Sequence, residues 1–152
     1  MKLYIVGSLA NHAIPQIANA LEAAGHTCFT DWWAGGRDAD LWWMEHERQR
    51  GRTHRQALAG HNARHIFEYD KSHLDQSDAA VLVMPAGRSG HLELGYMIGQ
   101  GKPGFTLFLK EPEKWDVMTL FSTPVWSVEE LIEALNEDGP GRRTVDHAPW
   151  NS

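Results

Sequence analysis

The stretch AAVLVMPAGRSGHLELGYMIGQGKP, residues 79–103, decides the fold class. It begins with a short apolar run, passes through a loop of small residues and ends in a helical pattern over 91–101. Similar short apolar runs alternate with helical patterns along most of the chain. This alternation is typical of βαβ units, in which parallel strands form a sheet covered by helices on both faces.

The same pattern predicts the order of the elements. We expect an α/β fold, a flavodoxin-like or Rossmann-like three-layer sandwich with a five-stranded, mainly parallel sheet. The strands are expected at 3–7, 26–31, 79–85, 105–110 and 125–126, and the helices at 14–24, 40–50, 62–76, 91–101 and 128–136. One domain should span 1–137, whereas 138–152 has no periodicity and is expected to be a C-terminal tail. The glycine pair at 35–36 should form a mobile loop.

Composition limits the classes of function. A chain of 152 residues with 42% hydrophobic and 22% charged residues is sufficient for one globular core. The formal net charge of -6 argues against binding to a nucleic-acid polymer or an anionic membrane. Cys28 is the only cysteine, which excludes an internal disulfide and a cysteine-rich zinc site. The apolar run at 3–6 is too short for a signal peptide or a membrane span, so we expect a cytoplasmic protein.

The expected topology places a crevice at one edge of the sheet. Ligands bind beyond the carboxyl ends of parallel strands, where the strand order reverses. With the order 2-1-3-4-5, the loops after the first and third strands lie side by side. This brings Gly7, Ser8 and Asn11 next to the segment 87–93.

Glu93 is the first candidate catalytic residue, because a carboxylate stands here among small residues. We expect it in the first turn of the helix at 91–101, where the helix dipole favours an ionised acid. The dipole alone is one explanation for Glu93, and a ligand facing it is another. The nearby Gly87, Gly90 and Gly95 suggest that something approaches closely.

Asp70 is the second candidate. Ile66, Asp70 and Leu74 are spaced by four, so they share one helix face, and a charge interrupts what should be an inward apolar stripe. The alternative is that Asp70 caps a new helix start.

Together these residues resemble the nucleoside 2-deoxyribosyltransferase superfamily, including its 2'-deoxynucleoside 5'-monophosphate N-hydrolase branch. The family pattern has an Asp, a second Asp eight residues later, an apolar strand, a small-residue loop, an "ELG"-like motif and "GKP". This chain supplies Asp70, Asp78, the strand 79–84, "ELG" at 93–95 and "GKP" at 101–103. The opening LYIVGS resembles the first strand of the family and its Tyr-x-x-Gly turn. The resemblance covers residues 3–30 and 66–110 and does not extend to the Trp-rich middle.

The resemblance implies roles for these residues. Glu93 would attack the anomeric carbon of the sugar, Asp70 would orient the sugar or assist protonation of the base, and Tyr4 would line the pocket. Such chemistry suits a carboxylate pair, because cleavage of an N-glycosidic bond develops oxocarbenium character. The substrate would be a nucleoside or nucleotide, no cofactor is expected, and a homo-oligomer, most simply a dimer, is implied.

The loop before Glu93 bears on the substrate. Ser89 and the backbone amides at the helix start could hold a 5'-phosphate, with Arg88 adding charge and with Gly87, Gly90 and His91 close by. The transferase branch has an Asp in this loop, and none stands between Pro85 and Glu93. This departure favours the monophosphate hydrolase branch. His91 would contact the substrate or point to solvent.

Other interpretations stay open. The chain could act on another N-glycoside, such as NAD, or it could be a catalytically silent nucleotide-binding module. His61 and His65 have a spacing that can bind metal, but we interpret them as a solvated helix face and expect no metal site. The tryptophans at 32, 33, 42 and 43 fit the core or a subunit contact better than a platform for a base.

Overall fold

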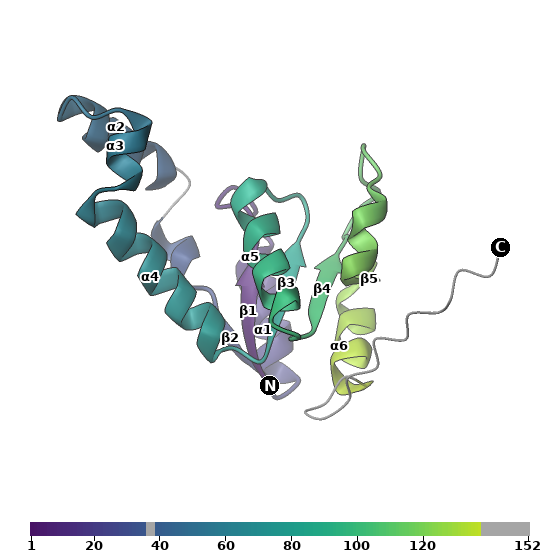
Figure 1. Cartoon of the computed structure of the whole chain (residues 1–152). Coiled ribbons are helices and arrows are strands. Elements are labelled where there is room, and N and C mark those ends of the chain that lie inside the picture. The colour runs from purple at the N-terminus through teal and green to yellow at the C-terminus, as the bar shows by residue number, and fades with distance from the viewer. Residues whose placement is uncertain (36–38, 138–152) are drawn as a thin grey trace.

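The computed structural model describes residues 1–35 and 39–137 and contains a five-stranded sheet (Figure 1). All four strand pairings are parallel, and the order is β2-β1-β3-β4-β5. The expected α/β sandwich and its strand order are therefore confirmed, and the order reverses between β1 and β3. The strands are β1 (Lys2–Val6), β2 (Thr27–Phe29), β3 (Ala79–Val83), β4 (Gly104–Leu107) and β5 (Thr123–Val125).

Helices cover both faces of the sheet. α1 (Ile14–Ala23) and α6 (Val128–Glu137) pack on one face, and α4 (His61–Gln76) and α5 (Arg88–Gly99) on the other. Side chains of a strand point alternately to the two faces. In β1, Leu3 and Ile5 therefore join the core under α1 and α6, whereas Tyr4 and Val6 join the core under α4 and α5.

The middle of the chain forms a helical arm. It contains α2 (Ala39–Gln49), α3 (His54–Leu58) and the first half of α4, and it stands away from the sheet in Figure 1. The short helix α3 was not expected from the sequence. It begins with a capping box, in which Thr53 accepts from the Gln56 amide and Gln56 accepts from the Thr53 amide.

Two short 3-10 helices complete the fold, η1 (Asp31–Gly35) and η2 (Val117–Phe121). Gly35 is therefore the last residue of η1, while the rest of the expected loop at 35–36 and the expected tail at 138–152 lie outside the described residues. No helix within 1–35 and 39–137 is long and apolar enough to cross a membrane.

Two expectations about helices were wrong. α5 begins at Arg88 rather than at 91, so Glu93 lies in the second turn and not in the first. Ile66 is 48% exposed, although Leu74 is buried, because the first half of α4 belongs to the arm and does not face the sheet. Asp70 therefore lies where α4 begins to contact the sheet, and it does not interrupt a continuous inward stripe.

Candidate active site

The described structure brings Tyr4, Asp70 and Glu93 together from three elements. Tyr4 is 1% exposed, and its hydroxyl donates a hydrogen bond to the Glu93 carboxylate. Burial raises the pKa of Tyr4, and the charges of Glu93 and Asp70 raise it further. Tyr4 therefore stays protonated at neutral pH and remains a hydrogen-bond donor between two carboxylates.

Local sequence explains how each side chain reaches this place. Tyr4 faces α4 and α5 because it alternates with Leu3 and Ile5 along β1. Asp70 precedes the buried Leu74 by one helical turn, and Glu93 precedes the buried Leu94 by one residue. Both carboxylates are half-buried, so they lie at the border between the core and solvent.

A polar network fixes α4 against α5 close to the carboxylates. The Tyr96 hydroxyl donates to Asp75, and Gln100 donates to both of these side chains. Lys102 Nζ donates to the carbonyl oxygens of Leu74 at 3.1 Å and Asp75 at 2.8 Å. Asp75 lies five residues after Asp70, and Tyr96 lies three residues after Glu93. The network therefore sets the relative position of the two candidate carboxylates.

An aromatic cluster stands next to Tyr4, and sequence reasoning missed it. Phe29 contacts Tyr4 with ring centroids 5.1 Å apart and stacks on His73 at 3.9 Å. Tyr69 meets His73 edge-on at 4.8 Å and is also close enough to influence the Tyr4 hydroxyl. The available signal was the spacing of four between Tyr69 and His73, on the same helix as Asp70.

The loop after β1 is ordered by its own hydrogen bonds. Ser8 Oγ accepts from the Ala10 amide, and Asn11 Oδ1 accepts from the Ala13 amide. A Cβ on Gly7 would lie 3.0 Å from Ile14 Cδ1, so Gly7 allows α1 to pack closely.

Two tryptophans attach η1 to this region. Trp32 Nε1 donates to the Ile5 carbonyl at 2.7 Å, and Trp33 Nε1 donates to the Asn11 carbonyl at 3.2 Å. Both rings are half-buried against the core, whereas Trp42 in the arm is 68% exposed.

The predicted loop residues separate onto different sides of α5. Ser89 lies four residues before Glu93 and shares its face. Gly90 is buried against the sheet, where a Cβ would lie 3.0 Å from Val6 Cγ1 and 3.1 Å from Leu82 Cδ1. Gly90 therefore serves close packing in this structure.

Arg88 and His91 point elsewhere. With Gly87 and Leu92 they line an open cavity of about 650 Å³, on a different side of α5 from Ser89 and Glu93. His91 Nδ1 donates to the Gly87 carbonyl at 2.8 Å, which holds the ring over the helix start.

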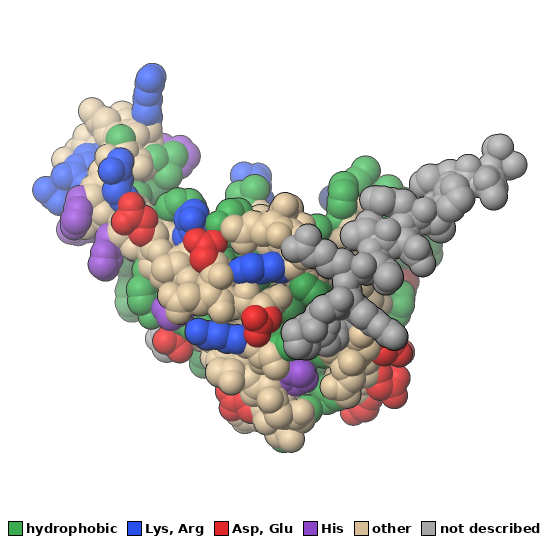
Figure 2. Space-filling view, turned by 60° about the horizontal axis from the view of Figure 1, so that its bottom comes forward, with side chains coloured by type: hydrophobic (Ala, Val, Ile, Leu, Met, Phe, Trp, Pro, Cys, Tyr) green, Lys and Arg blue, Asp and Glu red, His purple; other side chains and the backbone are tan. Residues whose placement is uncertain are grey.

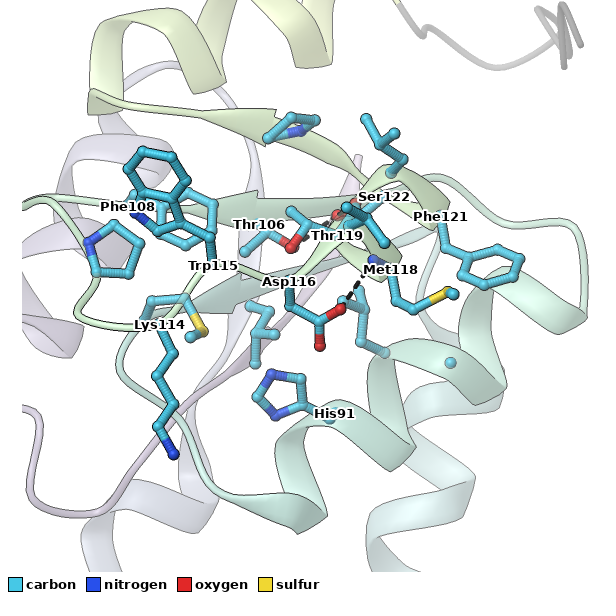
Figure 3. A pocket seen from close by; sticks show the side chains of 18 of the residues that line it. His91, Thr106, Phe108, Lys114, Trp115, Asp116, Met118, Thr119, Phe121 and Ser122 are labelled. Carbon is cyan, nitrogen blue, oxygen red and sulfur yellow. Dashed lines mark hydrogen bonds between the residues drawn. The ribbon is translucent and has the colours of Figure 1, made fainter. Parts of the chain in front are cut away.

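A larger cavity of about 830 Å³ lies between α5 and η2, and we call it the η2 groove. It borders Leu94 and Gly95 of α5, while its other wall includes Trp115, Phe121 and Trp126 (Figure 3). Thr106 and Ser122 hydrogen-bond to each other at 2.6 Å within its lining. The groove therefore lies on a different side of α5 from Glu93. The larger of the two cavities is lined by neither Asp70 nor Glu93.

In the described parts of the chain, no group of three His, Cys, Asp or Glu side chains is arranged to hold a metal ion. His61 and His65 stack with ring centroids 6.3 Å apart on the arm.

Comparison with known proteins identifies the fold. No protein-family model matches the sequence, and no curated protein matches it either. Among solved structures, the chain is similar to a 2-deoxyribosyltransferase from Bacillus psychrosaccharolyticus, with a TM-score of 0.57 and 17% identity over 87% of this chain and 90% of that one. It is also similar to a conserved protein from Enterococcus faecalis V583, with a TM-score of 0.58 and 14% identity over 90% of this chain and 98% of that one. The protein thus shares its fold with a 2-deoxyribosyltransferase, in agreement with the nucleoside 2-deoxyribosyltransferase superfamily that its sequence resembles.

Proposed function

We propose that the protein cleaves the N-glycosidic bond of a (deoxy)nucleoside 5'-monophosphate or nucleoside, by hydrolysis or by deoxyribosyl transfer, with Glu93 as the nucleophile. The observation that carries this proposal is the hydrogen bond from the buried Tyr4 to Glu93, beside Asp70, where the strand order reverses. The likeness of the fold to a 2-deoxyribosyltransferase supports it at the level of the family.

The proposed reaction has two steps. The Glu93 carboxylate bonds to the anomeric carbon while the bond from that carbon to the base nitrogen breaks, and the base leaves with the bonding electrons and takes up a proton. Asp70 orients the sugar or assists this protonation. Water or a second base then attacks the same carbon and releases Glu93. Water gives hydrolysis, and a second base gives transfer.

Tyr4 would act as a positioning and stabilising donor. Because its pKa is raised, Tyr4 holds Glu93 through a neutral hydroxyl and favours the ionised carboxylate that the first step needs. Glu93 lies in the second turn of α5, where the helix dipole has weakened. We therefore propose that this hydrogen bond, rather than the dipole, stabilises the carboxylate.

The phosphate site is proposed at the start of α5. Ser89 shares a face with Glu93, and the first-turn backbone amides of a helix have no partner within the helix. Gly87 at the N-cap leaves the approach free of a side chain. Arg88 and His91 line the cavity on another side, so we assign them no contact with the Glu93 side.

Two other functions predict different products. A glycohydrolase acting on NAD would release nicotinamide, and a silent binding module would bind nucleotides without releasing a base. We further propose that the protein is cytoplasmic and homo-oligomeric.

Base release tests the proposal. Wild type is incubated with nucleosides, nucleoside monophosphates and NAD, and the free base is separated and quantified. We expect turnover of at least one nucleoside or monophosphate and its loss in Glu93→Ala and Glu93→Gln. Glu129→Ala, which removes an exposed carboxylate from α6, is the matched control and should keep full turnover. Equal rates in wild type and Glu93→Gln would refute the mechanism.

The phosphate site has a separate test. Ser89→Ala should raise KM for a monophosphate and leave KM for the corresponding nucleoside unchanged, because only the first substrate carries the group that Ser89 would hold. An equal change for both substrates would remove Ser89 from the phosphate site.

A further inference from the structure

Helix α4 has different surroundings along its length. Its first half belongs to the arm, where Ile66 and Phe67 are 48% and 64% exposed. Figure 2 shows Arg and His side chains exposed over the same arm. Its second half lies on the sheet, where Leu74 is 4% exposed. Asp70 lies between the two halves, so the position of its carboxylate depends on how this turn of the helix is attached to the rest of the fold.

Two contacts tie the second half of α4 to α5 and the loop that follows it. Lys102 Nζ donates hydrogen bonds to two carbonyl oxygens in the last turn of α4. Lys71 Nζ lies over the Tyr96 ring of α5, 5.6 Å from its centroid. These contacts act on the side of the helix that faces α5. The attachment of the Asp70 turn to the sheet comes from another side of the helix.

The attachment to the sheet includes an aromatic stack. His73 lies three residues after Asp70 and therefore on the same side of α4. Its ring is nearly parallel to that of Phe29, with an interplanar angle of 12° and ring centroids 3.9 Å apart. Tyr69 meets the His73 ring edge-on at 4.8 Å. Such ring pairs contribute stabilisation beyond the area that they bury.

Phe29 is a firm support for this stack. It is 8% exposed at the end of β2, its register places it beside Tyr4 on β1, and the two rings contact each other at 5.1 Å. Tyr4, Phe29 and His73 thus form a continuous row of rings from β1 to α4. Burial and the charge of Glu93 raise the pKa of Tyr4, and the charge of Asp70 raises it further. The row of rings therefore connects Tyr4 to the turn whose carboxylate acts on it.

We propose that His73 is a positioning residue, whose stack on Phe29 fixes the turn of α4 that carries Asp70. His73 thereby sets the place of the Asp70 carboxylate relative to Tyr4. The flat face of the His73 ring performs this role, because a parallel stack uses the face and not the ring nitrogens. The expected effect on rate rests on the proposed function, whereas the effect on the Asp70 carboxylate does not.

Two substitutions at position 73 separate the ring face from the ring nitrogens. His73→Phe keeps a flat ring for the stack, and His73→Leu removes it. The readout is the carbon NMR signal of the Asp70 side-chain carboxyl, which is assigned by its loss in Asp70→Asn. This signal should keep its chemical shift in His73→Phe and change it in His73→Leu. The control is His65→Leu, which removes an exposed imidazole from the arm and should leave the signal unchanged.

Base release measures the consequence for the reaction. A misplacement of about 1 Å can cost about 100-fold in rate, so His73→Leu should lower kcat/KM by about 10- to 100-fold and His73→Phe by about threefold or less. A residue that acts through Asp70 has nothing to position once that carboxylate is gone. In the Asp70→Asn background, His73→Leu should therefore cause no further loss. Urea unfolding establishes that each variant is folded under the assay conditions.

The outcomes distinguish the positioning role from a merely structural one. An unchanged Asp70 signal in His73→Leu would overturn the proposal, and so would the same loss of kcat/KM with and without Asp70→Asn. Equal defects in His73→Phe and His73→Leu would assign the role to the ring nitrogens and overturn it as well. If wild type releases no base, the proposed reaction is refuted, and the Asp70 signal still decides whether His73 positions the carboxylate.

Discussion

Replacing Tyr4 with phenylalanine tests the centre of the proposed site. The substitution removes one hydroxyl from a side chain that is 1% exposed and keeps the ring that packs against Phe29. The lost interaction is a hydrogen bond to the Glu93 carboxylate. Hydrogen bonds to charged groups contribute about 1.5–3 kcal/mol, so Tyr4→Phe should lower the free energy of unfolding near pH 7 by about this amount.

The same loss should appear in catalysis as a shift in pH dependence. The hydroxyl stabilises the ionised carboxylate, and about 1.4 kcal/mol corresponds to one pH unit. In Tyr4→Phe the acid limb of the profile of kcat/KM against pH should therefore move upward by about one to two pH units. The measurement is base release at a series of pH values with the best substrate from the panel.

Tyr96→Phe is the matched control. It also removes a hydroxyl that donates to a carboxylate between α4 and α5, but its partner Asp75 is exposed. We expect a smaller loss of stability than for Tyr4→Phe and an unchanged pH profile. An identical profile for wild type and Tyr4→Phe, or the same shift in Tyr96→Phe, would refute the assignment of Tyr4 to the site.

Three further predictions concern the rest of the fold. A Cβ on Gly104 would lie 2.7 Å from Ile98 Cγ1, so Gly104→Ala should lower the free energy of unfolding in urea by about 1–3 kcal/mol. Most of this loss should disappear when Ile98 is also replaced by alanine. An equal loss with and without Ile98→Ala would contradict the packing. Burial raises the pKa of the Cys28 thiol to about 11, so alkylation of the native protein at pH 8 should be much slower than alkylation of the urea-unfolded chain. Equal alkylation rates would contradict the raised pKa. The hydrogen bond from Lys71, with that from Tyr96, lowers the pKa of Asp75 to about 2, so its contribution to stability is present above pH 3.8 and is lost as the pH falls toward 2. Urea midpoints of wild type and Asp75→Asn should therefore differ at pH 6 and converge toward pH 2, and a constant difference would argue against this linkage.

The sheet could be predicted from sequence because its signal is local. The two central strands β1 and β3 lie in short apolar runs, and β3 is buried along its whole length, as expected for a strand covered on both faces. The helical crossovers predicted parallel neighbours, and the assumed order 2-1-3-4-5, which the structure has, placed the crevice between β1 and β3. Tyr4 lies on β1 and Glu93 lies on the helix that follows β3, so the candidate site joins the two strands between which the order reverses.

The start of α5 could not be predicted from the sequence, and the reason is physical. The N-cap is Gly87, which provides no side-chain cap, and the first turn holds Arg88, Ser89 and Gly90, which show no apolar periodicity. The side chain that would have marked the inward face is missing at Gly90, because the sheet approaches too closely for a Cβ.

The exposure of the apolar side chains on the arm could not be predicted, for a related reason. Apolar periodicity predicts a buried face when the helix covers a core of the same chain. Ile66 and Phe67 have the expected character but are 48% and 64% exposed, because the first half of α4 extends away from the sheet.

The position of Gly90 also explains why a glutamate stands among small residues. Gly90 brings α5 close to the sheet, against Val6 and Leu82. Val6 and Tyr4 point to the same face of β1, and Glu93 lies almost one turn after Gly90 along α5. Close contact between Gly90 and Val6 therefore brings the carboxylate of Glu93 within reach of the Tyr4 hydroxyl. Gly90 therefore acts by setting the distance between α5 and the sheet, and the partner of Glu93 is a hydroxyl donor from β1.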